Sequence, residues 1–200
     1  MIGITGGIAS GKSVVSERLR HLGAVVLDAD VFSKDAVKPH TPGWERVKVA
    51  FPDVIQGDLT IDRRLLGRII FANADKREIL ESIIHPEVLG RLKAEARGAE
   101  QEGKVVFAEV PLLYEVGWES FMEQVWVVYA REDVQLERLM ERAGISREEA
   151  QLMVASQLSL EEKVERATEV IDNSSSLEET WRQVDALWKE LECDPSIERA

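Results

Sequence analysis

The chain has 200 residues, of which 44% are hydrophobic and 31% are charged, a composition typical of a folded globular protein. Its 25 Lys and Arg residues against 37 Asp and Glu residues give a net charge of −12, which disfavours nucleic acid as a partner. The single cysteine, Cys193, excludes an intramolecular disulfide framework and a cysteine zinc site. We expect one compact unit that binds a small phosphorylated ligand in a pocket.

Targeting signals are not evident in the sequence. No apolar run approaches the ~20 residues that cross a bilayer, and the first strand leads directly into a glycine-rich loop, which leaves no room for a signal peptide. Together with the lone cysteine, this predicts a cytoplasmic protein without a membrane partner, present as a monomer or a weak homo-oligomer.

The predicted elements begin with a buried strand at residues 1–5, which ends in a glycine-rich loop. The loop reads GGIASGKS at residues 6–13 and fits the phosphate-binding pattern GxxxxGK followed by Ser or Thr, with a helix predicted from about Lys12. In this pattern backbone N–H groups approach phosphate oxygens, Lys12 reaches the β- and γ-phosphates, and the Ser13 hydroxyl is a ligand for Mg²⁺. The alternative is a plain glycine-rich turn, which the flanking strand and helix disfavour. The predicted residues for binding ATP and Mg²⁺ are Gly7, Ala9, Ser10, Gly11, Lys12, Ser13 and Val14.

Further short apolar segments at residues 24–27, 105–110, 125–130 and 170–171 predict, with the first strand, a five-stranded parallel sheet. Carboxylates follow or end two of these strands, at Asp28 with Asp30 and at Glu109. Open α/β sheets bind their ligands at the carboxyl ends of the strands, so we expect these groups at one site. The predicted fold is α/β, a P-loop NTPase three-layer sandwich.

Helical segments interrupt this pattern twice. About 75 residues separate the second and third predicted strands, more than one crossover helix requires, and their pattern is mostly helical. We expect a helical acceptor-binding insertion at about 31–103 and a helical lid at about 132–165 within a single domain of residues 1–200. A last helix at 176–191 places six apolar residues on one face, which we interpret as core: Leu177, Trp181, Val184, Leu187, Trp188 and Leu191.

The class of enzyme depends on a second motif. The guanine-reading NKxD and the DxxG turn of GTP-binding switch proteins are missing from the sequence, which disfavours a GTPase. Asp28 and Asp30 directly after the second strand are typical of small-molecule kinases, where one carboxylate orients the Mg²⁺ shell and the other faces the acceptor hydroxyl. We assign Asp30 to the hydroxyl and Asp28 to the metal, and the reverse assignment stays open. The alternative is a solvated loop after a strand.

A series of motifs in order and spacing resembles the dephospho-CoA kinases over essentially the whole chain. The motifs are TGGIASGKS at 5–13, LDAD at 27–30, DRR at 62–64 with Leu66, IFAN at 70–73, IHP at 84–86, VPLLYE at 110–115 and VIDN at 170–173. The resemblance implies transfer of the ATP γ-phosphate to the ribose 3′-hydroxyl of dephospho-CoA, the last step of coenzyme A synthesis. It also implies a helical CoA-binding insertion and a lid on a P-loop kinase fold.

The same resemblance implies roles for single residues. Asp30 matches the family's proposed base and, with Lys12, Arg138 and Arg142, makes up the catalytic set; the two arginines match lid residues and share a helix face. The implied acceptor-binding residues are Asp30, Arg63, Phe71, His85, Leu112 and Glu115, and Asn173 is a neighbour of the ATP base.

Several of these residues have structural alternatives. His85 before proline is also typical of a residue that caps a helix end, and Phe71 at helical spacing is typical of a core residue. Glu115 either orients the acceptor or caps the next helix, and Arg138 and Arg142 either face ATP or form an ordinary salt-bridged helix with Glu137 and Glu141.

Two rival functions remain at this stage. One is another small-molecule kinase with the DxD pattern, which the long helical insertion and the motifs around Phe71 and His85 disfavour. The other is an ATP-binding switch without chemistry, which would have no need for the acceptor-side carboxylates.

Overall fold

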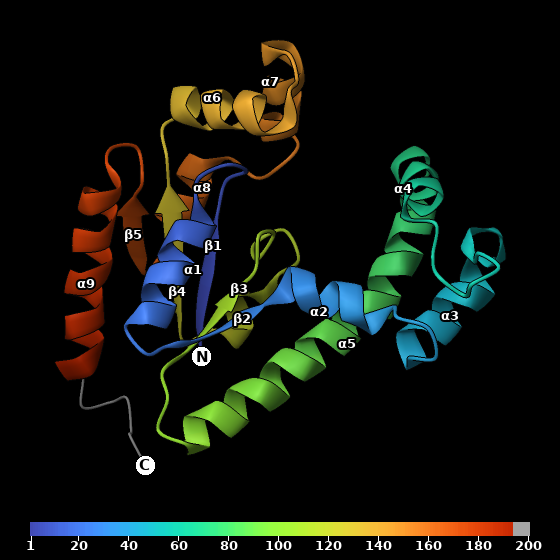
Figure 1. Ribbon diagram of the computed structural model, residues 1–200, viewed down its shortest axis with the longest axis horizontal. Helices are drawn as coiled ribbons and strands as arrows, with labels where there is room; N and C mark the ends of the chain where they lie inside the picture. Colours follow the sequence, from blue (N-terminus) through green and yellow to red (C-terminus); the bar gives the residue numbers. More distant parts are fainter. Residues whose placement is uncertain (194–200) are drawn as a thin grey trace. The chain divides into compact units, whose positions relative to one another are not determined.

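The computed structural model describes residues 1–193, which divide into two compact units. The larger unit contains residues 1–27 and the chain from residue 96 onward, and the helical unit contains residues 28–95 (Figure 1). The sequence led us to expect one compact unit, but the inserted helices enclose an apolar core of their own and therefore form a separate unit. No helix within residues 1–193 is both long enough and apolar enough to span a membrane.

A five-stranded sheet in the order β2-β3-β1-β4-β5 organises residues 1–193 (Figure 1). The strands are β1 (Ile2–Gly6), β2 (Val25–Asp28), β3 (Val106–Glu109), β4 (Gln124–Tyr129) and β5 (Glu169–Asp172). The pairs β1 with β3, β1 with β4 and β4 with β5 are parallel, with Gly3 opposite Ala108 and Val125. This order confirms the predicted α/β fold class, and the strand bounds agree with the sequence within about two residues.

The core of the larger unit lies between the sheet and two helices, α1 (Lys12–His21) and α9 (Leu177–Cys193). Alternate strand residues such as Ile4, Trp126 and Ile171 pack against Val15 of α1 and Trp188 of α9. On the other face of β1 the side chains of Leu113 and Met122 pack close to Gly3, and a Cβ there, 2.6 Å from Leu113 Cδ1, would force Leu113 to move. The remaining helices of this unit are η2 (Trp118–Phe121), α6 (Glu132–Ala143), α7 (Arg147–Ala155) and α8 (Leu160–Glu165).

The helical unit encloses a second core, with Val47, Phe51, Val54 and Leu80 among its buried residues. Its elements are α2 (Ala29–Ala36), α3 (Pro42–Ala50), η1 (Pro52–Val54), α4 (Arg63–Ala72) and most of α5 (Ala74–Gln101), whose last residues belong to the larger unit. Local signals define several helix starts, because the side chain of Thr41 caps α3 and that of Asp62 caps α4.

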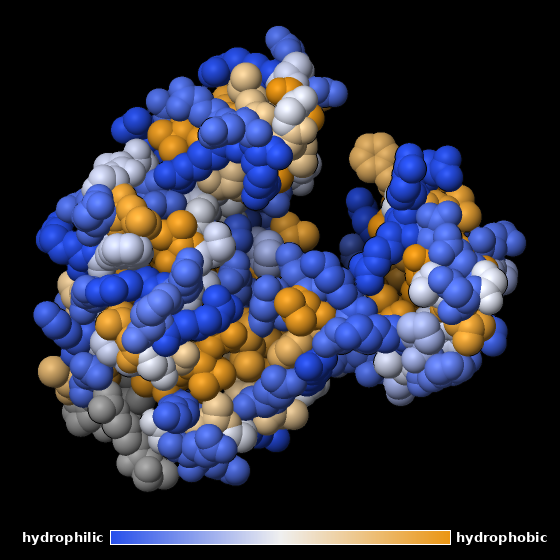
Figure 2. Space-filling view, viewed as in Figure 1, coloured by the Kyte–Doolittle hydropathy of each residue, from blue (hydrophilic) through white to orange (hydrophobic). Residues whose placement is uncertain are grey.

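The last helix departs from the prediction at one end. Val184, Trp188 and Leu191 are buried as expected, but Trp181 and Leu177 at the start of α9 are 36% and 41% exposed. Their interpretation as core was wrong, because the Arg18 guanidinium of α1 lies 5.4 Å from the Trp181 ring centroid and the two apolar side chains line a surface groove. Figure 2 shows such hydrophobic patches between hydrophilic residues on the visible surface of either unit.

Candidate active site

The loop between β1 and α1 has the geometry of a phosphate-binding loop. Gly11 has φ 90°, and a Cβ at this position would overlap the Asn173 side-chain nitrogen, so only glycine fits. Ala9 has φ 57°, a left-handed conformation that costs a residue with a side chain about 1–2 kcal/mol. Strain of this kind persists only where the surroundings hold the backbone in place.

Two residues from distant segments hold the loop. Asn173 Nδ2 donates to Ser10 O at 2.7 Å, and Thr180 Oγ1 donates to Asn173 Oδ1 at 2.8 Å. Arg138 from α6 donates to Asn173 O at 2.9 Å and to Ser10 O at 3.4 Å. The structure thus brings two of the predicted residues, Arg138 and Asn173, onto the phosphate loop. The Asn173 amide supports the loop itself, and its expected place beside the ATP base stays a prediction.

Lys12 and Ser13 begin α1 at the end of the loop. Lys12 Nζ donates to Gly7 O at 3.0 Å and to Gly6 O at 3.3 Å, which places its ammonium over the loop. Ser13 is exposed in the first turn of α1, where its hydroxyl is accessible to a ligand. Within residues 1–193 no cluster of three or more His, Cys, Asp or Glu side chains is arranged to hold a metal ion. Mg²⁺ in nucleotide sites is usually held by one or two protein oxygens together with substrate phosphate and water, and an exposed serine hydroxyl suits that kind of site.

The helices α6 and α7 pack on the phosphate loop through apolar side chains. Leu136 and Leu139 of α6 form a buried cluster with Ala150 of α7, and Ile8 and Ala9 of the loop pack against it. Arg138 of α6 donates to backbone carbonyls of Ser10 and Asn173, which favours the expected place of Arg138 beside the phosphate loop over a side-chain ion pair within the helix. Arg142, one turn after Arg138, is exposed.

Strand β3 ends beside α1 with an acidic residue. Ser16 of α1, which is fully buried, donates from its hydroxyl to Glu109 Oε2 at 2.6 Å, and Thr5 Oγ1 donates to Pro111 O at 3.1 Å. These bonds set the carboxyl end of β3 against the strand and helix that carry the phosphate loop. The sequence had pointed to Glu109, but the partner Ser16 carries no motif signal.

Asp28 and Asp30 belong to the helical unit, where Asp28 ends β2 and Asp30 lies in the first turn of α2. Asp28 Oδ1 accepts from the backbone N–H groups of Asp30 and Val31 at 2.8 and 3.1 Å and so caps α2. Sequence reasoning missed this cap, although an aspartate just before a helix is its usual signal. The division of the two carboxylates between metal and acceptor stays a prediction.

A pocket of about 280 Å³ opens in the helical unit, and two predicted acceptor residues line it. Asp30 and Lys34 come from α2 and Arg63 from the start of α4, so a carboxylate and two cations share the pocket. Its apolar lining includes Val37, Leu66, Ile70, Leu80 and Ile84. A pocket with an apolar wall and a few charged groups suits an organic ligand that carries phosphate.

Phe71 lies in the last turn of α4 and is 94% exposed. The interpretation of Phe71 as a core residue was therefore wrong. The helix buries Leu66 instead, and the spacing of five residues places Phe71 on a different face. An exposed phenyl ring of this kind is available to stack on a planar ligand.

His85 lies inside α5, followed by Pro86 within the same helix, and is half-buried. The alternative that His85 caps a helix end was wrong, because α5 continues to Gln101 through the proline. Its predicted contact with the acceptor is not tested by its position in the helix.

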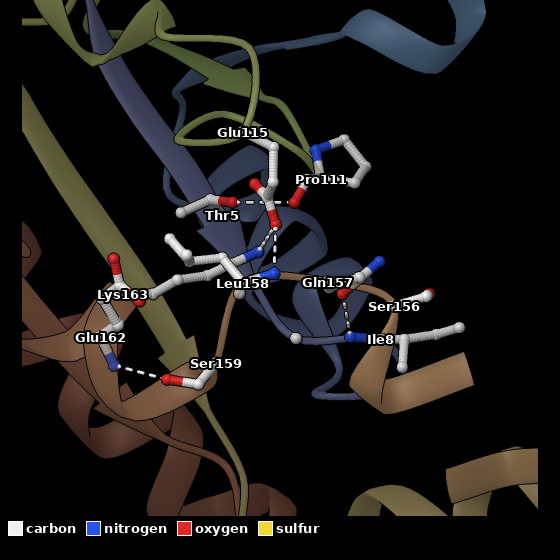
Figure 3. Close-up of polar contacts among 12 residues, drawn as sticks. Thr5, Ile8, Pro111, Glu115, Ser156, Gln157, Leu158, Ser159, Glu162 and Lys163 are labelled. Carbon is white, nitrogen blue, oxygen red and sulfur yellow. Dashed lines mark hydrogen bonds and ion pairs between the residues drawn. The ribbon is translucent and has the colours of Figure 1, made fainter. Parts of the chain in front are cut away.

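The motif that follows β3 is divided between surface and core. Leu112 is 42% exposed, whereas Tyr114 is buried, with the Arg166 guanidinium 4.3 Å from its ring centroid, and burial raises the pKa of Tyr114. Glu115 Oε1 lies 2.7 Å from Lys163 Nζ and accepts from Leu158 N at 3.1 Å (Figure 3). The alternative that Glu115 caps the next helix was wrong, because its partners come from the segment around α8.

Comparison with known proteins agrees with this geometry. Residues 1–179 match the model of a protein family described as "Dephospho-CoA kinase". A dephospho-CoA kinase of Geobacter metallireducens is 46% identical over 192 residues, which cover 95% of this chain and 96% of that protein. Among solved structures, protein TT1252 of Thermus thermophilus is 39% identical with a TM-score of 0.83, and a dephospho-CoA kinase of Campylobacter jejuni is 28% identical with a TM-score of 0.73. Each pair covers 95% of this chain and 96% of the other.

The parallel sheet in the order 2-3-1-4-5 and the phosphate loop held by an α6 arginine define a P-loop kinase. The family match over residues 1–179 and the 46% identity to a curated relative over 192 residues make the assignment more specific: the chain belongs to the dephospho-CoA kinase family.

Proposed function

We propose that the protein transfers the γ-phosphate of ATP to the 3′-hydroxyl of the ribose of dephospho-CoA and yields CoA and ADP. The observation that carries this proposal is the family match over residues 1–179, which spans both the phosphate loop and the pocket of the helical unit. The distribution of charge also supports binding of two phosphorylated substrates. The net charge of the chain is −12, yet Lys12 lies at the phosphate loop and Lys34 and Arg63 line the pocket of the helical unit.

On the ATP side, backbone N–H groups of the loop and Lys12 hold the β- and γ-phosphates. The Ser13 hydroxyl would hold a Mg²⁺ ion and Asp28 would orient its water ligands, and the ion would supply positive charge to the phosphates. The exposed Arg142 and the loop-bound Arg138 supply cations to the transferring phosphoryl group.

On the acceptor side, Asp30 accepts a hydrogen bond from the 3′-hydroxyl and takes its proton as the new O–P bond forms and the bond from Pγ to the ADP oxygen breaks. Arg63 binds an acceptor phosphate and Phe71 stacks on the acceptor adenine, while His85 and Leu112 complete the acceptor contacts. Arg63 is the partner best supported by geometry, because it lines the same pocket as Asp30.

The test measures the release of ADP from Mg·ATP with dephospho-CoA as the acceptor, and compares it with shikimate, gluconate, AMP and no acceptor. Mass spectrometry of the product checks for the addition of one phosphate group. Release only with dephospho-CoA supports the proposal. Release with another acceptor identifies a different P-loop kinase, and ATP binding without release identifies a switch. A cytoplasmic location and a monomeric or weakly oligomeric state stay predictions beside this test.

The Lys12→Ala variant is the matched negative control. It removes the ammonium that lies over the loop, so turnover should fall by a factor of about 100 or more while the melting temperature changes little. The check is the ADP-release rate together with a thermal melt. Near-normal turnover by a folded variant would contradict the assignment of the phosphate loop.

A further inference from the structure

A polar network joins three segments of the larger unit that are far apart in sequence (Figure 3). Gln157 Oε1, between α7 and α8, accepts from the N–H of Ile8 in the phosphate loop at 3.0 Å. The next residue, Leu158, donates its N–H to Glu115 Oε1 in the loop after β3, and Lys163 of α8 lies against the same oxygen at 2.7 Å. The connection between α7 and α8 is thus tied both to the phosphate loop and to the segment after β3.

The stability of this network depends on the ion pair between Lys163 and Glu115. Its side chain is 0% exposed, whereas Glu115 is 23% exposed. An ammonium buried this completely is costly without an opposite charge, and removal of one member of a buried pair leaves the other uncompensated. Glu115 therefore stabilises the position of α8, and Ser159 adds a cap at its start by accepting from Glu162 N at 3.1 Å.

The bond to Ile8 acts on the strained part of the loop. Ile8 precedes Ala9, whose positive φ needs support from its surroundings. Asn173 and Arg138 bind the loop at Ser10 O, on one side of Ala9. On the other side, Gln157 accepts from the Ile8 N–H, and Lys12 Nζ donates to Gly7 O within the loop. Displacement of the α7–α8 connection would release this side and allow the loop to relax away from the phosphate-binding conformation.

We propose that Glu115, Lys163 and Gln157 are positioning residues for ATP, and that Glu115 acts through the α7–α8 connection on the phosphate loop instead of touching the acceptor. The inference rests on the kinase function proposed above, but ATP binding without acceptor tests it independently of turnover.

The first experiment measures the Kd for Mg·ATP without acceptor for the Gln157→Leu variant, which removes the acceptor of the Ile8 N–H and changes no charge. Loss of one hydrogen bond predicts a rise of about two- to tenfold, with the KM for dephospho-CoA unchanged. An unchanged Kd in a folded variant would overturn the proposal.

The second experiment compares Glu115→Gln, Lys163→Met and the variant with both substitutions. Each single variant should raise the Kd for ATP by at least about threefold and lower the melting temperature. The double variant should recover on both measures, because it buries no unpaired charge and the introduced amide oxygen can still accept from Leu158 N. The matched control is Arg182→Met, which removes an exposed cation from its pair with Glu179 on α9 and should leave the Kd unchanged.

The KM for dephospho-CoA separates this role from the one that the family resemblance implied. If it rises in Glu115→Gln and stays high in the double variant while the Kd for ATP is normal, Glu115 contacts the acceptor and the proposal fails. If the double variant recovers ATP affinity and no variant changes the acceptor KM by more than twofold, the proposal holds. Should Glu115→Gln not fold, Gln157→Leu and Lys163→Met decide in the same way.

Discussion

Phe71 is a large apolar side chain that α4 presents to solvent, and its exposure suits a role in binding. Base–aromatic stacking contributes about 1–3 kcal/mol, so Phe71→Ala should raise the KM for dephospho-CoA by at least about fivefold. The free energy of unfolding should change by less than about 0.5 kcal/mol, because little buried surface is lost. Steady-state kinetics and urea unfolding check both parts.

The matched control is Val49→Ala in α3, another apolar residue of the helical unit that is 83% exposed and does not line the pocket. It should change neither quantity. Equal effects of the two substitutions on the KM would mean that Phe71 does not contact the acceptor.

Asp30 is the residue on which the acceptor assignment depends. Asp30→Asn keeps the size of the side chain and its backbone N–H bond to Asp28, but it removes the proton acceptor. Turnover should fall by about 100-fold or more, with the Kd for ATP unchanged. Calorimetric titration with Mg·ATP beside the rate assay checks this, and a parallel loss of ATP affinity would place Asp30 on the metal instead.

At the scale of elements, α1 and α9 are joined by a double hydrogen bond. Arg18 Nε and Nη2 donate to the two oxygens of Asp185 at 2.7 and 2.6 Å. The Arg18 partner lowers the pKa of Asp185, despite the opposing effect of burial. Because the pKa is lower in the folded state, the stabilisation is present above the unfolded value of about 3.9 and is lost as the pH falls through the folded value.

We therefore expect Asp185→Asn to lower the free energy of unfolding by up to about 1 kcal/mol at pH 7, since both side chains are partly exposed. The difference from the original protein should shrink below about pH 4. Chemical unfolding at neutral and at acidic pH measures it, and a difference that grows in acid would contradict the assigned pKa direction.

The helices around the phosphate loop contact it in two ways, through apolar packing and through hydrogen bonds to its backbone. The apolar faces of α6 and α7 pack on Ile8 and Ala9, and polar groups from α6 and from the α7–α8 connection bind the loop backbone. Periodicity predicts the apolar faces, since Leu136 and Leu139 are three apart on one helix. It says nothing of Gln157 or Lys163, whose polar side chains resemble those of any solvated helix end.

At the scale of the whole molecule, most residues proposed to bind ATP lie in the larger unit, and most residues proposed to bind the acceptor lie in the helical unit. The phosphate loop, Arg138 and Asn173 all belong to the larger unit, whereas Asp30, Arg63 and Phe71 belong to the helical unit. Each unit has its own core, so damage to one core should affect one substrate more than the other.

Val54→Ala in the helical unit and Val184→Ala in the larger unit test this separation, because both valines are 0% exposed. Each should cost about 2 kcal/mol of unfolding free energy. Val54→Ala should raise the KM for dephospho-CoA and leave the Kd for ATP near normal, and Val184→Ala should do the reverse. The KM for dephospho-CoA and the Kd for ATP are measured at a temperature where both variants are folded. If each variant changes both constants equally, the two units do not act separately.

The fold class, the phosphate loop and the family could be predicted from the amino-acid order, because they depend on local patterns: apolar periodicity, glycines in the loop, and Lys12 and Ser13 at fixed spacing. The sequence also predicted that the insertion is mostly helical, which α3, α4 and α5 confirm. Four features became clear from the folded chain: Phe71 is exposed, Asp28 caps α2, Trp181 lies at the surface, and Glu115 pairs with a buried Lys163. Exposure and ion pairing are properties of neighbours brought together from distant parts of the chain, and no local pattern encodes which neighbours those are.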